Sequence, residues 1–166
     1  VHGKGLKGFH APGTPINCIR SGTTMRLLAG LLVAQPFEST LTGEEQLLRR
    51  PMERVAKPLR QMGASIYTTD GHAPILIVGK HLLHGARLVL DVPSAQVKSA
   101  ILLAALHADS PTTILETAPA RDHTERMLRA MGVDLKACDS DGVREITLIP
   151  PLHPLSSLEI NVPGDF

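Results

Sequence analysis

The sequence predicts an α/β protein built from a repeated β/α unit, with buried helices inside and sheets outside. The segments 21–34 and 97–106 are apolar on all sides, as expected for helices enclosed in a core. Each is followed by the same order of elements, namely a strand, a one-sided helix and a strand pair around Asp-Gly. We place the first unit at about 17–79 and the second at about 91–149.

The first unit begins with a helix and a strand. Ser21 gives the helix 21–34 a small polar start, and 37–41 follows as a strand. A second helix starts near Pro51, a residue that the first turn tolerates. Its apolar residues fall on one side, as in an amphipathic helix: Met52, Val55, Leu59 and Met62.

The end of this helix and the hairpin after it complete the first unit. Pro58 inside the helix implies a kink, and Gly63 suits its C-terminal end. The segments 65–69 and 75–78, joined by Asp70-Gly71, predict a hairpin.

The second unit repeats this order. After the helix 97–106, the segment 112–115 is predicted as a strand. Asp122 suits the N-cap of the next helix, with Glu125 at the capping-box distance.

A second hairpin closes this unit. The segments 133–137 and 145–149 flank Asp141-Gly142, in the same way as in the first unit. The segment 156–166 starts a third unit or a hinge.

Composition supports a packed core and argues against several functions. Of 166 residues, 43% are hydrophobic and 2% aromatic, so the core must be aliphatic. So few aromatic side chains argue against base stacking on single-stranded nucleic acid. A net charge of +1 is too small to favour electrostatic binding to duplex DNA or to an acidic membrane. The longest apolar run, Leu27 to Ala34, is too short to span a bilayer.

The cysteines indicate the cellular compartment of the protein, and the two ends of the sequence indicate whether it is a fragment. Cys18 and Cys138 are too few for a disulfide scaffold or a four-cysteine zinc site, so we expect buried free thiols in a cytoplasmic protein. No signal peptide is visible. Because the chain starts at Val1 and stops in a strand-to-turn pattern, we expect a fragment of a longer protein.

The starts of the two apolar helices are candidate anion sites. Both 21–24 and 94–96 are small and polar, and free N–H groups and the positive end of the helix dipole lie there. Gly22 lets a ligand approach the backbone, and the Gln96 amide can both donate and accept. A plain N-cap is an equal alternative for each start, and the duplication favours a ligand.

Arginines strengthen this hypothesis. Arg50 and Arg121 each precede a helix start, and a guanidinium binds phosphate or carboxylate through paired hydrogen bonds. The alternative for each is a solvated surface side chain, which is also our interpretation of Arg49 and Arg54. The eight histidines form no metal-binding pattern, so no metal or cofactor is expected.

Together these motifs resemble the 5-enolpyruvylshikimate-3-phosphate (EPSP) synthase family, the 3-phosphoshikimate 1-carboxyvinyltransferases. The resemblance runs over almost the whole chain, with its motifs in the right order. It rests on Ser21-Gly22-Thr23-Thr24-Met25-Arg26, Leu41-Thr42-Gly43-Glu44, Arg49-Arg50-Pro51-Met52, Pro93-Ser94-Ala95-Gln96-Val97-Lys98-Ser99-Ala100, Arg121-Asp122-His123-Thr124-Glu125 and Val162-Pro163-Gly164-Asp165.

The resemblance implies a fold and a reaction. The fold is the inside-out α/β barrel of enolpyruvyl transferases, with two lobes of three β/α units each, of which this chain would hold about two of one lobe. The family transfers the enolpyruvyl group of phosphoenolpyruvate to the 5-hydroxyl of shikimate 3-phosphate and releases phosphate. This step of the shikimate pathway leads to chorismate and the aromatic amino acids. The resemblance further implies that the protein needs no cofactor, has no nucleic-acid or membrane partner, and is a monomer at full length.

The resemblance also assigns site residues by motif. The shikimate 3-phosphate group consists of Ser94, Ala95, Gln96 and Arg121. The phosphoenolpyruvate group consists of Gly22, Arg50 and Gln96. Gly22 would leave room beside phosphoenolpyruvate, which implies sensitivity to the competitor glyphosate. The family's proton-transfer groups match no residue of this chain, so we expect no catalytic residue here, and binding without turnover.

One departure and two alternatives accompany the resemblance. The family usually has Gly-Asn where Ile19-Arg20 stand, so a bulky side chain and a cation lie next to the anion site. One alternative is a relative of the UDP-N-acetylglucosamine enolpyruvyl transferase, whose reactive loop carries a cysteine that 43–51 lacks. The other is a non-catalytic anion-binding module.

Overall fold

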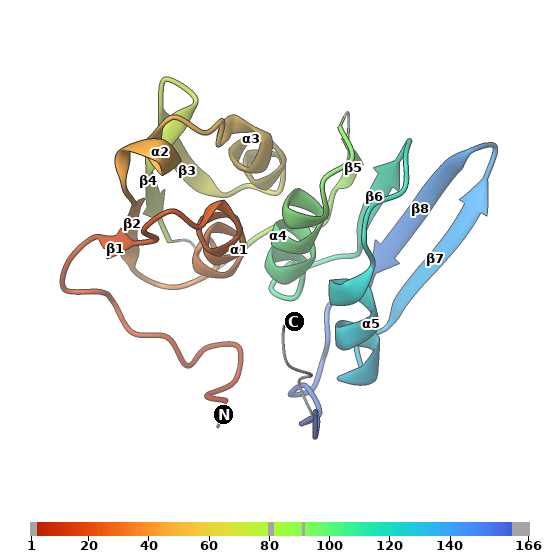
Figure 1. Cartoon of the computed structure of the whole chain (residues 1–166). Helices are drawn as coiled ribbons and strands as arrows, with labels where there is room; N and C mark the ends of the chain where they lie inside the picture. The colour runs from red at the N-terminus through yellow and green to blue at the C-terminus, as the bar shows by residue number, and fades with distance from the viewer. Residues whose placement is uncertain (1–2, 80–81, 91, 161–166) are drawn as a thin grey trace.

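Two four-stranded sheets lie on either side of a group of helices (Figure 1). The computed structural model describes residues 3–79, 82–90 and 92–160. The first half contains β1 (Ile16–Asn17), α1 (Gly22–Leu32), β2 (Glu38–Thr42), α2 (Glu45–Leu48), α3 (Glu53–Gln61), β3 (Ser65–Thr69) and β4 (His72–Val78). The second half contains β5 (Arg87–Leu90), α4 (Ala95–Ala105), β6 (Thr112–Glu116), α5 (His123–Ala130), β7 (Leu135–Ser140) and β8 (Val143–Leu148). The predicted α/β class with helices between outer sheets is therefore confirmed.

The two sheets have the same topology. Their strand orders are β1-β2-β4-β3 and β5-β6-β8-β7, with one parallel pair followed by antiparallel pairs. Each ends in a hairpin whose turn holds Asp and Gly at positive φ, 50° and 79° for Asp70-Gly71 and 51° and 76° for Asp141-Gly142. Positive φ at both central residues is the geometry for which Asp-Gly is favoured in two-residue hairpins. Both predicted hairpins are thus present.

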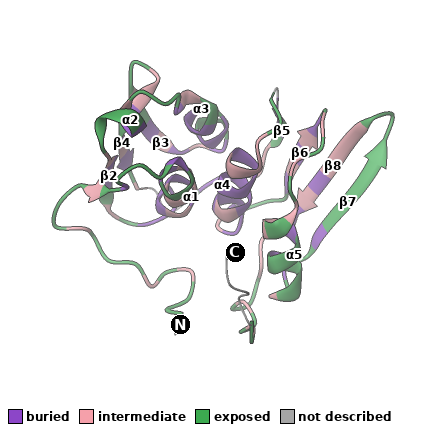
Figure 2. Ribbon diagram, in the orientation of Figure 1, coloured by how far each residue is buried: buried purple, intermediate pink, exposed green. Residues whose placement is uncertain are grey.

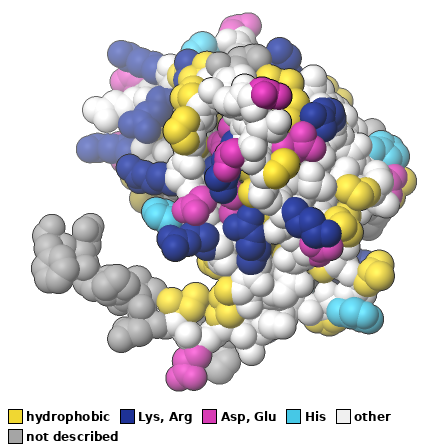
Figure 3. Space-filling view, turned by 90° about the vertical axis from the view of Figure 1, so that its right-hand side faces the viewer, with side chains coloured by type: hydrophobic (Ala, Val, Ile, Leu, Met, Phe, Trp, Pro, Cys, Tyr) yellow, Lys and Arg dark blue, Asp and Glu magenta, His cyan; other side chains and the backbone are white. Residues whose placement is uncertain are grey.

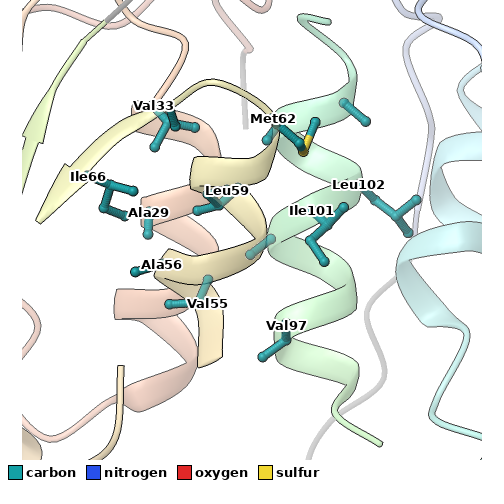
Figure 4. Close-up of a cluster of buried hydrophobic side chains, with 14 of the residues drawn as sticks. Ala29, Val33, Val55, Ala56, Leu59, Met62, Ile66, Val97, Ile101 and Leu102 are labelled. Atoms are coloured by element: carbon teal, nitrogen blue, oxygen red, sulfur yellow. The ribbon is translucent and has the colours of Figure 1, made fainter. Parts of the chain in front are cut away.

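The aliphatic core lies where α1, α3 and α4 meet. Buried side chains from all three helices belong to one cluster, among them Ala29 of α1, Leu59 of α3 and Ile101 of α4 (Figure 4). The α1 and α4 backbones come very close, because a Cβ on Gly30 would lie 2.2 Å from the Ala100 carbonyl oxygen. This close contact brings the N-terminal ends of the two helices into one region of the molecule.

The two central helices differ in how far they are enclosed (Figure 2). Most of α4 is buried, as predicted, because it packs against α1 and α3 and also against α5 and β6. The same prediction is wrong for α1, whose Leu27, Leu28 and Leu31 are only half-buried. The neighbours of α1 are α4, α3 and β2, and they leave this stretch of it partly open among the described residues.

Several short elements and one cap differ from the predictions. The strand β5 and the single-turn helix α2 were not expected. Pro51 precedes α3 rather than occupying its first turn, since the N-cap is Met52. Asp122 does occupy the N-cap of α5, but its side chain makes no capping hydrogen bond, and Glu125 is buried beside Lys98 instead. The predicted capping box is therefore wrong.

Other expectations concern the cysteines and the end of the chain. Cys18 is buried as expected, whereas Cys138 is exposed on β7. Residues 156–160 have no regular secondary structure, and the rest of the expected third unit or hinge, 161–166, lies outside the described residues. Within the described ranges, no helix combines the length and apolar character needed to cross a bilayer.

The outer face of the second sheet carries charges of both signs. Lys and Arg side chains lie among Asp and Glu on the face shown in Figure 3. An ion pair crosses the strands on this face, with Arg87 2.9 Å from Glu145. Among the described residues, acidic side chains therefore interrupt the basic ones over this sheet, which does not favour a polyanion.

Candidate functional site

The two helix starts identified in the sequence begin with a serine cap. The Ser21 Oγ accepts a hydrogen bond from the Thr24 N–H at 3.1 Å, and the Ser94 Oγ accepts one from the Val97 N–H at 3.4 Å. Both serines therefore act as N-caps, which was the plain alternative for each. One cap satisfies only one of the free N–H groups of a first turn, so capping and anion binding are compatible.

Gln96 joins the two helix starts. Its Oε1 accepts a hydrogen bond from Arg26 Nη1 at 2.6 Å, and its Nε2 donates to Thr23 Oγ1 at 2.8 Å. Arg26 also donates from its other terminal nitrogen to the Pro51 carbonyl at 3.1 Å. One amide thus connects α4 to α1, and one guanidinium connects α1 to the segment that carries Arg50.

Gly22 lies beneath two guanidinium groups. A Cβ at this position would lie 3.0 Å from Arg26 Nη1 and 3.1 Å from Arg50 Nη1. Any larger residue would therefore crowd the space that these cations face. The resemblance assigned Gly22 and Arg50 to the same group of site residues, and the structure places them side by side.

A group of cations surrounds this helix start. Burial lowers the pKa of Arg26, and the positive charges of Arg50 and Arg54 lower it further. An anion among these three arginines would offset their repulsion. Sequence reasoning did not assign Arg26 and interpreted Arg54 as a solvated side chain. The spacing offered a clue for Arg26, because it lies four residues after Gly22 and so on the same helix face.

Arg121 and Ser94, which the resemblance assigned to the same substrate, lie in different surroundings. Arg121 is exposed between β6 and α5, and makes no ion pair or hydrogen bond within the described part of the chain. Ser94 lines a groove of about 410 Å³ between α3 and the start of α4, whose cationic residues are Arg54, Lys57 and Arg87. The structure thus leaves Arg121 available to a ligand without joining it to Ser94 by a direct contact.

Ile19 has an unusual backbone for its residue type. Its φ is +54°, in the left-handed region that glycine adopts easily. The backbone is held there by two hydrogen bonds, from the Ile19 N–H to Asn17 Oδ1 at 2.8 Å and from the Glu44 N–H to the Ile19 carbonyl at 2.7 Å. Arg20 forms an ion pair with the Glu44 carboxylate. The loop therefore keeps a shape that suits the glycine expected here.

Replacing Ile19 by glycine should stabilise the chain by about 0.5–1 kcal/mol. Left-handed φ costs an L-residue roughly 1–2 kcal/mol, of which the greater freedom of unfolded glycine offsets roughly half. The side chain is 58% exposed, so little apolar burial is lost. Urea denaturation measures the change. Ile19→Ala is the control, since it keeps a Cβ and should gain less; a lower midpoint for Ile19→Gly than for Ile19→Ala would contradict the strain.

Comparisons with known proteins agree in sequence and in fold. The family model for EPSP synthase (3-phosphoshikimate 1-carboxyvinyltransferase) matches residues 1–166. A 3-phosphoshikimate 1-carboxyvinyltransferase from Lactiplantibacillus plantarum is 47% identical over 166 residues, covering 100% of this chain and 38% of that protein. One from Acidithiobacillus ferrooxidans is 49% identical over 170 residues, covering 99% and 37%.

A solved structure shows the same fold. EPSP synthase from Acinetobacter baumannii superposes with a TM-score of 0.86 at 48% identity, over 93% of this chain and 34% of that one. The chain therefore spans well under half of the length of the relatives it matches.

Proposed function

The chain belongs to the EPSP synthase family, and from that premise we propose that it forms part of an enzyme that transfers the enolpyruvyl group of phosphoenolpyruvate to the 5-hydroxyl of shikimate 3-phosphate, releasing phosphate. The main support is the position of Gln96, whose side chain links the start of α4 to the start of α1. Both helix starts can bind an anion, and Arg26, Arg50 and Arg54 lie close to that of α1. Two anionic substrates repel each other in solution. Cations and helix starts offset that repulsion and fix the distance between the reacting groups.

Each helix start takes one substrate in this proposal. Shikimate 3-phosphate binds at Ser94, Ala95, Gln96 and Arg121. Phosphoenolpyruvate binds at Gly22, Arg50 and Gln96, and Arg26 joins this second group because its Nη1 lies above Gly22. A glycine at that point supports a compact anion close to the helix backbone. The competitor glyphosate would occupy the same place.

The proposal extends to the whole protein. The chain supplies about two units of one three-unit lobe, at about 17–79 and 91–149, with 156–166 as a hinge or a third unit. The complete enzyme acts in the cytoplasm as a monomer, in the route to aromatic amino acids. Its proton-transfer groups belong to other parts of the protein.

Arg121→Ala should weaken binding of shikimate 3-phosphate to the chain about tenfold or more, because a charge-assisted hydrogen bond to phosphate contributes about 1.5–3 kcal/mol. Arg50→Ala should weaken phosphoenolpyruvate by a similar factor. Isothermal titration calorimetry measures both affinities.

Arg49→Ala is the matched control, since Arg49 neighbours Arg50 but pairs with Glu45 on the surface. UDP-N-acetylglucosamine should not bind. Equal losses for both ligands in both variants would contradict the division into half-sites.

The 166-residue chain by itself should form no EPSP above the uncatalysed background. It holds binding groups, but none of its residues is assigned to proton transfer, and general acid–base groups supply a large part of the rate. Phosphorus NMR of chain mixed with both substrates measures product and released phosphate. EPSP formation that rises in proportion to the concentration of purified chain would show that a proton-transfer group has been overlooked.

A further inference from the structure

Three charged side chains are buried together in the second unit. Lys98 from α4, Glu116 from the end of β6 and Glu125 from the first turn of α5 have side chains that are 1%, 0% and 0% exposed. We call these residues the buried triad. Lys98 Nζ lies 2.9 Å from Glu116 Oε2 and 2.7 Å from Glu125 Oε1. Burying charge in this way is costly unless the groups have a specific task or very good partners.

The buried triad contacts the segment that carries Arg121. Lys98 Nζ also donates a hydrogen bond to the Ala120 carbonyl at 3.3 Å, the peptide group immediately before Arg121. Next to Lys98, Ser99 Oγ lies 2.7 Å from Thr124 Oγ1 in the first turn of α5. Two neighbouring residues of α4 therefore hold both sides of Arg121. The same helix begins at the Ser94 cap, so α4 links the proposed phosphate ligands to one another.

The first unit shows that the fold does not require these charges. Met25 follows the Ser21 cap by four residues, as Lys98 follows Ser94, and both donate their backbone N–H to the carbonyl of the cap. Met25 is fully buried. At the position of Lys98, the first copy of the unit therefore places an apolar side chain.

The positions of the two glutamates carry no charge in the first unit either. Arg60 and Arg129 match each other, since each donates from Nε to the carbonyl six residues later at 2.8 Å. Four residues before them stand Ala56 and Glu125. Strand pairing matches Ser39 of β2 with Thr112 of β6, because their partners Ile77 and Leu148 pair in turn with Ile66 and Leu135. Glu116 lies four residues after Thr112, so its counterpart four residues after Ser39 is Gly43. The uncharged residues Met25, Gly43 and Ala56 are therefore sufficient for the same architecture.

We propose that the buried triad is a positioning device for Arg121, with Lys98 as its central residue. Lys98 fixes the Ala120 carbonyl, and Glu116 and Glu125 fix the Lys98 ammonium from β6 and α5. Arg121 therefore stands on a backbone of defined position relative to the Ser94 start, although its own side chain makes no hydrogen bond or ion pair with the described residues. The proposal rests on the proposed function, in which Arg121 binds the phosphate of shikimate 3-phosphate.

The test removes the three charges of the buried triad, which the first unit does without. In the full chain, Lys98→Met, Glu116→Leu and Glu125→Ala are combined, and calorimetry measures shikimate 3-phosphate and phosphoenolpyruvate. We expect the combined variant to lose about as much shikimate 3-phosphate affinity as Arg121→Ala, on the order of tenfold. Adding Arg121→Ala to it should cause little further loss, and phosphoenolpyruvate affinity should stay unchanged. This split is one that a merely structural role would not produce.

Three outcomes decide the matter. A folded combined variant that binds shikimate 3-phosphate as tightly as the unaltered chain overturns the positioning role. Unchanged affinity in Arg121→Ala overturns the proposed function instead. If the combined variant does not fold, Lys98→Met with Glu116→Gln replaces it, because Glu125 keeps Arg129 at 3.7 Å and Arg144 at 3.5 Å as cations. The same loss of affinity is expected there, and full affinity overturns the inference.

Discussion

Lys98→Met alone is expected to lower the free energy of unfolding by about 3–5 kcal/mol, the usual cost of removing one partner from a buried ion pair. The substitution leaves Glu116 buried without its cation, and Glu116 Oε1 already lacks a hydrogen-bond partner among the described residues. Glu125 is affected less, because Arg129 and Arg144 remain near it. Urea denaturation at neutral pH measures the loss.

Two comparisons separate the charge effect from the loss of the lysine side chain. Lys57→Met changes an exposed lysine of α3 and should alter stability by about 0.5 kcal/mol or less. The combined Lys98→Met, Glu116→Leu and Glu125→Ala variant should recover most of the lost stability, because no uncompensated charge stays buried. A single Lys98→Met variant within about 1 kcal/mol of the unaltered chain would be incompatible with this view of the buried triad.

Gly30→Val is expected to destabilise the chain by about 3 kcal/mol, at the upper end of the range for overpacking. A Cβ here would lie 2.2 Å from the Ala100 carbonyl oxygen and 2.7 Å from its carbon. Both obstacles belong to the backbone of α4, so no side-chain rotation relieves the clash and the helices must move apart. Thermal denaturation measures the loss of stability.

Moving the helices apart should also affect the site. The hydrogen bonds of Gln96 to Arg26 and Thr23 cross from one helix to the other, so affinity for both substrates should fall together. Gly13→Ala is the control, since a Cβ at Gly13 meets no atom within 4 Å. If Gly30→Val melts like Gly13→Ala, the close approach of the two helices is not needed for the fold.

The elements that the sequence predicts well are those set by local chemistry. The Asp-Gly turns require positive φ at adjacent positions, and few other residue pairs provide it. The central helices follow from long apolar runs. By contrast, β5 spans only Arg87–Leu90 and gives too short a pattern to separate a strand from a loop.

The features that could not be predicted from the sequence depend on contacts between residues far apart in the chain. Glu125 stands at the capping-box spacing after Asp122, but a buried Lys98 attracts its carboxylate more strongly than a backbone N–H does. Arg26 enters the candidate site through Gln96, which lies 70 residues away in the chain. Such a pairing becomes visible only when two repeats pack together. The duplication itself was readable, and it correctly indicated which helix starts to compare.

The amide of Gln96 belongs to both helix starts, and this has a consequence for how ligands affect each other. Its oxygen binds Arg26 and its nitrogen binds Thr23, so neither group can turn toward a ligand without changing the hydrogen bonds of the other. If each helix start binds one substrate, as in the proposed function, occupancy at one start should alter the free energy of binding at the other. By thermodynamic linkage this effect is equal in both directions. In the proposed function, the shared Gln96 side chain would thus couple the two binding sites, and the total free energy of binding both substrates would not depend on which one binds first.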